Sequence, residues 1–133
     1  MKTLFTILIA VLCSTLLGIK APASEFPDIS VDTLEELIKS GEVVLVDVNG
    51  SKYFAKGHIP GAIDFRAHEE EIATVLGENQ SVPIVVYCGS PSCEAYEAAA
   101  IMIRDAGYTN IRHLSAGISG WIGAGKETAR LDQ

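Results

Sequence analysis

Two short runs of branched apolar residues place the strongest constraint on how this chain of 133 residues can fold. Residues 43–48 read VVLVDV, and residues 84–87 read IVVY. Neither run alternates polar with apolar residues, so both predict strands that are buried on both faces. Such strands are typical of a parallel sheet covered by helices on each side. We therefore expect a small α/β domain with a mostly parallel sheet.

The remaining elements are predicted from periodicity, caps and glycine stops. Helices are expected to begin at Ser30 or Asp32 and run through Lys39, and then over residues 53–56, 69–76, 93–106 and 117–121. Further strands are expected over residues 62–65 and 111–114. Inward-facing positions are expected at Leu34, Leu37, Ile38, Ile72, Val75, Leu76, Ala95, Ala98, Ala99, Met102 and Ile103.

The N-terminal segment has the pattern of an export signal. Lys2 is followed by an uncharged run over residues 3–19 and then by Ala21-Pro22-Ala23, which is the small-x-small pattern that signal peptidases accept. This pattern predicts a cleaved signal over residues 1–23 and one exported domain, periplasmic or secreted, over residues 24–133. The alternative is a retained membrane anchor, but the run lies at the short edge of the roughly 17 to 25 residues that span a bilayer.

The acidic charge balance limits the classes of partner. Loss of Lys2 and Lys20 with the signal reduces 10 basic residues to 8 against 17 acidic ones, which is a net charge of −9. Nucleic acids and anionic membranes require basic patches, so neither is an expected partner of the mature chain. We expect a monomer that acts on small molecules, with a partner protein left open.

Cys88 and Cys93 are the two cysteines outside the predicted signal, and they enclose a turn of small residues. Cys88 directly follows the strand predicted over residues 84–87, and the turn Gly89-Ser90-Pro91-Ser92 leads into a helix. Backbone N–H groups that wrap into a helix N-terminus converge on one point, and the helix dipole adds positive potential there. This cradle would stabilise a thiolate or a persulfide on Cys88. The alternative is a buried structural cysteine in an ordinary strand–helix connection.

Three segments together resemble the rhodanese-like (sulfurtransferase) domain family over residues 29–123. They are VVLVDVNGSKYFAKGHIPGAIDF, IVVYC and AGYTNIRHLSAGISGW, and GHIPGA is the most specific piece. The resemblance implies a five-stranded parallel sheet with helices on both sides, and Cys88 as the residue that accepts a sulfane sulfur. It also implies structural rather than catalytic roles for Asp47 and His58, and a core position for Trp121. No cofactor or metal is implied.

The chain departs from the family pattern at three positions. Asn49 stands where an arginine usually follows Asp-Val, Cys93 stands where the loop usually ends in a basic residue, and Glu94 stands where serine is common. No Lys or Arg lies between Cys88 and Cys93, so the loop offers no cationic side chain to bind thiosulfate, which is a dianion. Thiosulfate is therefore expected to be a poor donor. Phosphatases and arsenate reductases of this fold need an arginine at the position of Glu94, which makes phosphoester chemistry improbable.

Three hypotheses follow for the function. The first is a sulfurtransferase that carries a persulfide on Cys88 and passes the sulfur to a thiol or to cyanide. The second is a dithiol redox or sulfur-relay protein in which Cys93 attacks the persulfide or pairs with Cys88. The third is a non-catalytic binding module or a soft-metal site, although two cysteines without a nearby histidine form an incomplete zinc set.

The sequence leaves open whether Cys88 and Cys93 form a disulfide. Their Cα atoms would have to approach to roughly 4.4–6.8 Å with the side chains facing each other. We expect a wrapped loop to hold them just outside that range.

Overall fold

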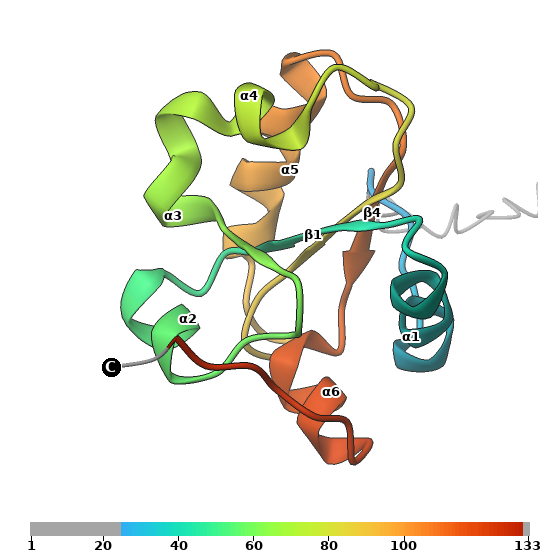
Figure 1. Cartoon of the computed structure of the whole chain (residues 1–133), viewed down its shortest axis with the longest axis vertical. Helices are drawn as coiled ribbons and strands as arrows, with labels where there is room; N and C mark the ends of the chain where they lie inside the picture. Colours follow the sequence, from blue (N-terminus) through green and yellow to red (C-terminus); the bar gives the residue numbers. More distant parts are fainter. Residues whose placement is uncertain (1–24, 132–133) are drawn as a thin grey trace, which may run out of the picture.

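The computed structural model describes residues 25–131 (Figure 1). The predicted signal over residues 1–23 lies outside the described residues. Among residues 25–131, no helix is both long enough and apolar enough to cross a membrane.

The sheet has four parallel strands in the order β2-β1-β3-β4. Their bounds are β1 Val44–Asp47, β2 Ile63–Asp64, β3 Ile84–Tyr87 and β4 Ile111–Leu114. The two apolar runs form the central pair, in which Val46 lies opposite Val86. This arrangement confirms the predicted α/β class with a parallel sheet.

The family resemblance implied five strands, whereas the sheet over residues 25–131 has four strands and a single-residue bridge at the edge of β4. Asp28 pairs in parallel with His113 at the outer edge of β4 as an isolated bridge. The backbone bonds on either side are His113 N–H to the Pro27 carbonyl and Ile29 N–H to the His113 carbonyl, both 2.9 Å. Pro27 has no N–H to extend the ladder, and Ser30 already caps the following helix, so the pairing stops after one residue.

Helices cover both faces of the sheet. Their bounds are α1 Val31–Ser40, α2 Ser51–Lys56, α3 Phe65–His68, the 3₁₀ turn η1 Glu69–Glu71, α4 Ile72–Leu76, α5 Ala95–Asp105 and α6 Gly117–Gly123. In Figure 1, α3, α4 and α5 lie above the strands, whereas α1 and α6 lie below them.

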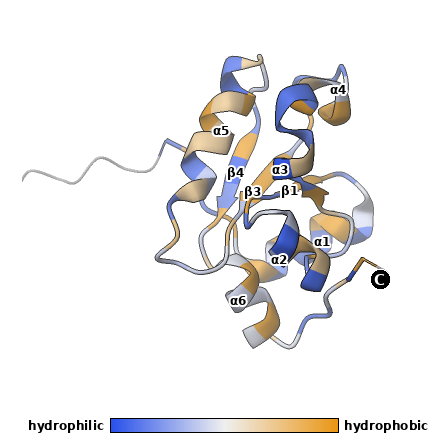
Figure 2. Ribbon diagram, turned by 90° about the vertical axis from the view of Figure 1, so that its left-hand side faces the viewer, coloured by the Kyte–Doolittle hydropathy of each residue, from blue (hydrophilic) through white to orange (hydrophobic). Residues whose placement is uncertain are grey.

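The alternation of side chains along the strands divides the core between these two layers. Val46, Ile84 and Val86 pack with residues of α4 and α5 on one face. Leu45, Val85 and Tyr87 pack with α1 and α6 on the other. Figure 2 shows hydrophobic colour along β1 and hydrophilic colour on parts of α2. Every side of the central strands is therefore buried, as their sequence requires.

The largest differences between the predicted and the observed helices concern two segments. The segment predicted as one helix over residues 69–76 is divided between η1 and α4. A separate helical turn, α3, precedes it, and the Asp64 carboxylate caps this turn by accepting the Arg66 and Ala67 N–H groups. Val75 was predicted to face inward but is exposed. Helix α5 begins two residues later than predicted, and its buried residues are Ala99, Ala100 and Ile103, whereas Met102, Ala95 and Ala98 are exposed.

Because the four strands are parallel, their carboxyl ends meet along one edge of the sheet. Asp47 ends β1, Cys88 follows β3, and Ala116 precedes α6 just beyond β4. This edge is where sites form in open α/β sheets.

Candidate active site

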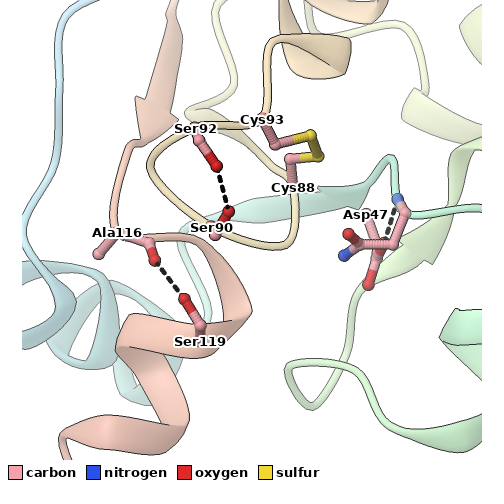
Figure 3. Close-up of a disulfide and its surroundings, with 8 residues drawn as sticks. Asp47, Cys88, Ser90, Ser92, Cys93, Ala116 and Ser119 are labelled. Carbon is pink, nitrogen blue, oxygen red and sulfur yellow. Dashed lines mark hydrogen bonds between the residues drawn. A yellow bond between two sulfur atoms is a disulfide. The ribbon is translucent and has the colours of Figure 1, made fainter.

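Cys88 is held at this edge by the backbone of α6. Cys88 is the first residue after the central strand β3, and only 4% of its surface is exposed. The Cys88 carbonyl accepts the Ile118 N–H at 2.9 Å, and the Gly89 carbonyl accepts the Ser119 N–H at 3.0 Å. The first part of the cysteine loop, residues 88–93, is thus fixed to the N-terminal turn of α6 (Figure 3).

Gly117 makes this close approach possible. Its φ is +64°, in the left-handed region, and a Cβ atom there would lie 2.7 Å from the Gly89 carbonyl carbon and the Ser90 nitrogen. A side chain at this position would therefore meet backbone that cannot move away. Sequence analysis placed Gly117 only as the start of a helix and missed its contact with the loop; the signal was the glycine in GISGW.

A proline-containing turn forms the second part of the loop. The Cys93 N–H donates to the Ser90 carbonyl at 3.0 Å, which closes a four-residue turn with Pro91 at its second position. Proline suits this position because its φ is already set, and the turn does not need its missing N–H. The Ser90 and Ser92 hydroxyls are 3.0 Å apart across the same turn. The chain therefore folds back and brings Cys93 over Cys88.

Cys88 and Cys93 form a disulfide in the structure. Their Cα atoms are 6.1 Å apart, inside the range that a disulfide permits. The expectation that the loop holds them outside this range was wrong, because the Ser90–Cys93 turn shortens the path between them. Cys93 is partly exposed, whereas Cys88 is buried.

The loop presents unused hydrogen-bond donors. Within residues 25–131, no acceptor bonds the backbone N–H groups of Gly89, Ser90 or Ser92. Pro91 contributes no donor. Backbone donors in a tight turn before a helix can hold an anionic sulfur without a cationic side chain.

Asp47, the last residue of β1, has a buried carboxyl group at the same edge of the sheet. It is fully buried, and Oδ1 accepts the Asn49 N–H at 2.8 Å, while no hydrogen bond reaches Oδ2. Burial raises the pKa of Asp47. The Asn49 N–H and the nearby Tyr87 hydroxyl stabilise the carboxylate and so act in the opposite direction. The Tyr87 hydroxyl is near the carboxylate but makes no hydrogen bond of normal geometry with it. The Tyr87 hydroxyl accepts the Ile59 N–H at 3.0 Å, and burial raises the pKa of Tyr87 as well. These contacts connect β1 and β3 to the segment that precedes β2.

His58 is enclosed by its own segment. Its ring stacks on Phe54 at 3.8 Å between centroids, and Nδ1 lies 2.8 Å from the Phe54 carbonyl, so Nδ1 carries the proton. Its backbone pairs with Ala129 in an antiparallel bridge. Trp121 is also buried, and its ring N–H donates to the Glu127 carbonyl at 2.7 Å. These contacts fit structural roles for both residues.

Asn49 and Glu94 lie on either side of the loop. The Asn49 side-chain oxygen is 3.2 Å from the position that a Cβ atom would take on Gly89, so Asn49 borders the loop directly. Glu94 is exposed and precedes α5, and its side chain makes no capping hydrogen bond there. Within residues 25–131, no three His, Cys, Asp or Glu side chains gather in a way that could hold a metal ion.

The fold and the site together define a class of small α/β proteins with a parallel sheet, in which a reactive cysteine lies in the loop after a central strand. The rhodanese-like domain family matches residues 30–124, and the chain belongs to this family. The resemblance that the sequence showed is thereby confirmed.

Curated relatives include proteins of different lengths and roles. The thiosulfate sulfurtransferase GlpE of Shewanella oneidensis is 31% identical over 101 residues, which are 74% of this chain and 94% of the relative. The uncharacterized protein YibN of Escherichia coli is 30% identical over 88% of this chain and 80% of its own. An HTH-type transcriptional regulator of Mycobacterium tuberculosis is 36% identical over 70% of this chain, which spans only 42% of that protein.

Solved structures share the fold. The BH2092 protein from Bacillus halodurans has a TM-score of 0.69 at 24% identity and covers 78% of this chain and 77% of its own. The human single-domain sulfurtransferase has a TM-score of 0.60 at 24% identity over 73% of this chain and 96% of its own. At this level of identity the likeness establishes the fold alone.

Proposed function

We propose that this protein is a sulfurtransferase in which Cys88 carries a sulfane sulfur as a persulfide. The Cys88 thiolate attacks the outer sulfur of a donor, whose remaining part leaves with the bonding electrons, and the persulfide then passes its sulfur to a thiol acceptor or to cyanide. The observation that supports this most directly is the placement of Cys88 directly after β3, in a loop whose Gly89, Ser90 and Ser92 N–H groups have no acceptor among residues 25–131. The resemblance to a thiosulfate sulfurtransferase agrees with the proposal.

The donor is proposed to be neutral or polysulfidic rather than thiosulfate. Residues 88–94 contain no cation, and Glu94 adds a negative charge at the loop's far end. A charge-assisted hydrogen bond to an oxyanion contributes roughly 1.5 to 3 kcal/mol, and each 1.4 kcal/mol is about a tenfold change. Polysulfides and persulfides do not present a sulfonate-like group and do not need this contact.

We expect Cys93→Arg to raise the rate of Cys88 loading from thiosulfate about ten- to a hundredfold. Loading from polysulfide or glutathione persulfide should change little, and Cys93→Ser, which removes the thiol without adding charge, should gain nothing on thiosulfate. The measurement is intact-protein mass spectrometry of each reduced protein after incubation with each donor. Equal thiosulfate rates in the arginine and serine variants would show that Cys93 selects no donor, and failure of every donor would favour the non-catalytic binding module.

We also propose that the protein is exported to the periplasm or beyond as one domain over residues 24–133, acting as a monomer. Ala21 and Ala23 are expected to direct cleavage so that the mature chain begins at Ser24 or within a residue or two of it. N-terminal sequencing of the protein recovered from cell fractions checks this. A chain that begins at Met1 in the membrane fraction would indicate a retained anchor instead.

A further inference from the structure

We infer that Cys93 resolves the Cys88 persulfide by releasing its sulfur as sulfide, so that the protein is a sulfide-producing enzyme that depends on a dithiol reductant. The inference rests on the proposed function, because it needs a persulfide on Cys88. It goes beyond that function by identifying the product, the second reacting residue and the chemical class of the reductant.

The geometry shows which sulfur Cys93 reaches. In the structure Cys93 is bonded to the sulfur of Cys88 itself, which is the inner sulfur of any persulfide formed there. A relay would require Cys93 to attack the outer sulfur, which would lie beyond Cys88 Sγ. The turn closed by the Cys93 N–H and the Ser90 carbonyl at 3.0 Å instead directs Cys93 to the inner atom.

The two ends of the loop differ in how firmly they are held. The Cys88 and Gly89 carbonyls are bonded to the backbone of α6, and Gly117 packs against Gly89 and Ser90. Apart from the disulfide, the hydrogen bond of the Cys93 N–H to the Ser90 carbonyl is the one that holds Cys93 among residues 25–131, and Cys93 lies two residues before α5 begins. The buried Cys88 is therefore a fixed target, and a thiol on the same loop reaches it more readily than a thiol from solution.

The reaction balances with one external reductant. The Cys93 thiolate attacks Cys88 Sγ, the sulfur–sulfur bond of the persulfide breaks, and the outer sulfur leaves as hydrosulfide with the bonding electrons. The sulfane sulfur is reduced to sulfide, and the two cysteines are oxidised to the disulfide seen in the structure. A dithiol then attacks Cys93, the partly exposed member of the pair, and leaves as its own cyclic disulfide, which restores both thiols.

The test is a single turnover of the full chain without added thiol. The protein is reduced, freed of reductant and incubated with excess thiosulfate until loading of Cys93→Ser is complete. Thiosulfate serves here although it is expected to load slowly, because its transfer to Cys88 releases sulfite and any sulfide then comes from the persulfide. We expect the wild-type chain to release one sulfide per chain and to lose both free thiols. Cys93→Ser should hold a stable persulfide and release sulfide only after a thiol is added, and Cys88→Ser should release none.

The outcomes separate this inference from the proposed function. A wild-type chain that keeps both its persulfide on Cys88 and a free Cys93 thiol would overturn the inference and leave the sulfurtransferase function standing. A persulfide on Cys93 without sulfide release would also overturn it, in favour of a relay. Absence of a persulfide on Cys88 in Cys93→Ser under every donor would overturn both.

Discussion

Cys88→Ser is expected to lower sulfur transfer by at least about a thousandfold with any donor, because the hydroxyl cannot form or carry a persulfide. Serine has nearly the shape of cysteine, and Cys88 packs at the end of β3 rather than filling a large part of the core. The variant should therefore fold. The measurement is the initial rate with polysulfide, together with the mass of the peptide that contains residue 88.

Cys93→Ser is the matched control for this variant. Both substitutions remove the same disulfide, so they share its effect on stability, which is small because the bridge closes a loop of only a few residues. Only Cys88→Ser should lose the ability to accept sulfur from polysulfide. Sulfur found on the residue-88 peptide of Cys88→Ser, or equal loss of loading in both variants, would contradict the role assigned to Cys88.

Gly117→Ala is expected to reduce the free energy of unfolding by about 2 to 4 kcal/mol and to lower sulfur transfer at least about tenfold. Alanine is strained at a φ of +64°, and its Cβ would lie 2.7 Å from the backbone of Gly89 and Ser90. Relief of this contact requires α6 to move away from the loop, which weakens the bonds that fix the Cys88 and Gly89 carbonyls. Denaturant unfolding and the polysulfide rate measure the two effects.

Gly123→Ala provides the control in the same helix. No atom lies within 4 Å of a Cβ placed on Gly123, and its backbone is not in the left-handed region. Alanine should leave the stability unchanged or raise it by up to about 1 kcal/mol, since it favours helix more than glycine does. Similar losses in both variants would indicate that α6 tolerates no substitution, and that Gly117 has no specific role at the loop.

The sequence alone predicted the layers of the fold and the reactive residue. The apolar runs over residues 43–48 and 84–87 correspond to β1 and β3, because branched apolar residues without polar alternation favour a strand buried on both faces. Cys88 was found by its place after such a strand. The Ser30 cap and the Gly41 stop of α1 were also readable, since both act within a few residues of the chain.

Features that depend on distant contacts were not predictable in this way. The bridge at Asp28 was not expected, and neither was the division of residues 65–76 among α3, η1 and α4, since both depend on how one segment meets another. The exposure of Val75 and Met102 shows the same limit, because helical spacing indicates a periodic face but not which neighbour covers it.

The cysteine loop shows most clearly what each level determines. Its composition, with two cysteines, a proline and no cation, is a property of the sequence and sets which donors it can bind. Whether the two sulfurs meet was decided by the tertiary structure, which anchors Gly89 against Gly117 and folds the Ser90–Cys93 turn back over β3. The physical reason is that the type of a residue determines which reactions and contacts its side chain can make. The distance between two atoms of a loop depends instead on the helices and strands that hold the ends of that loop.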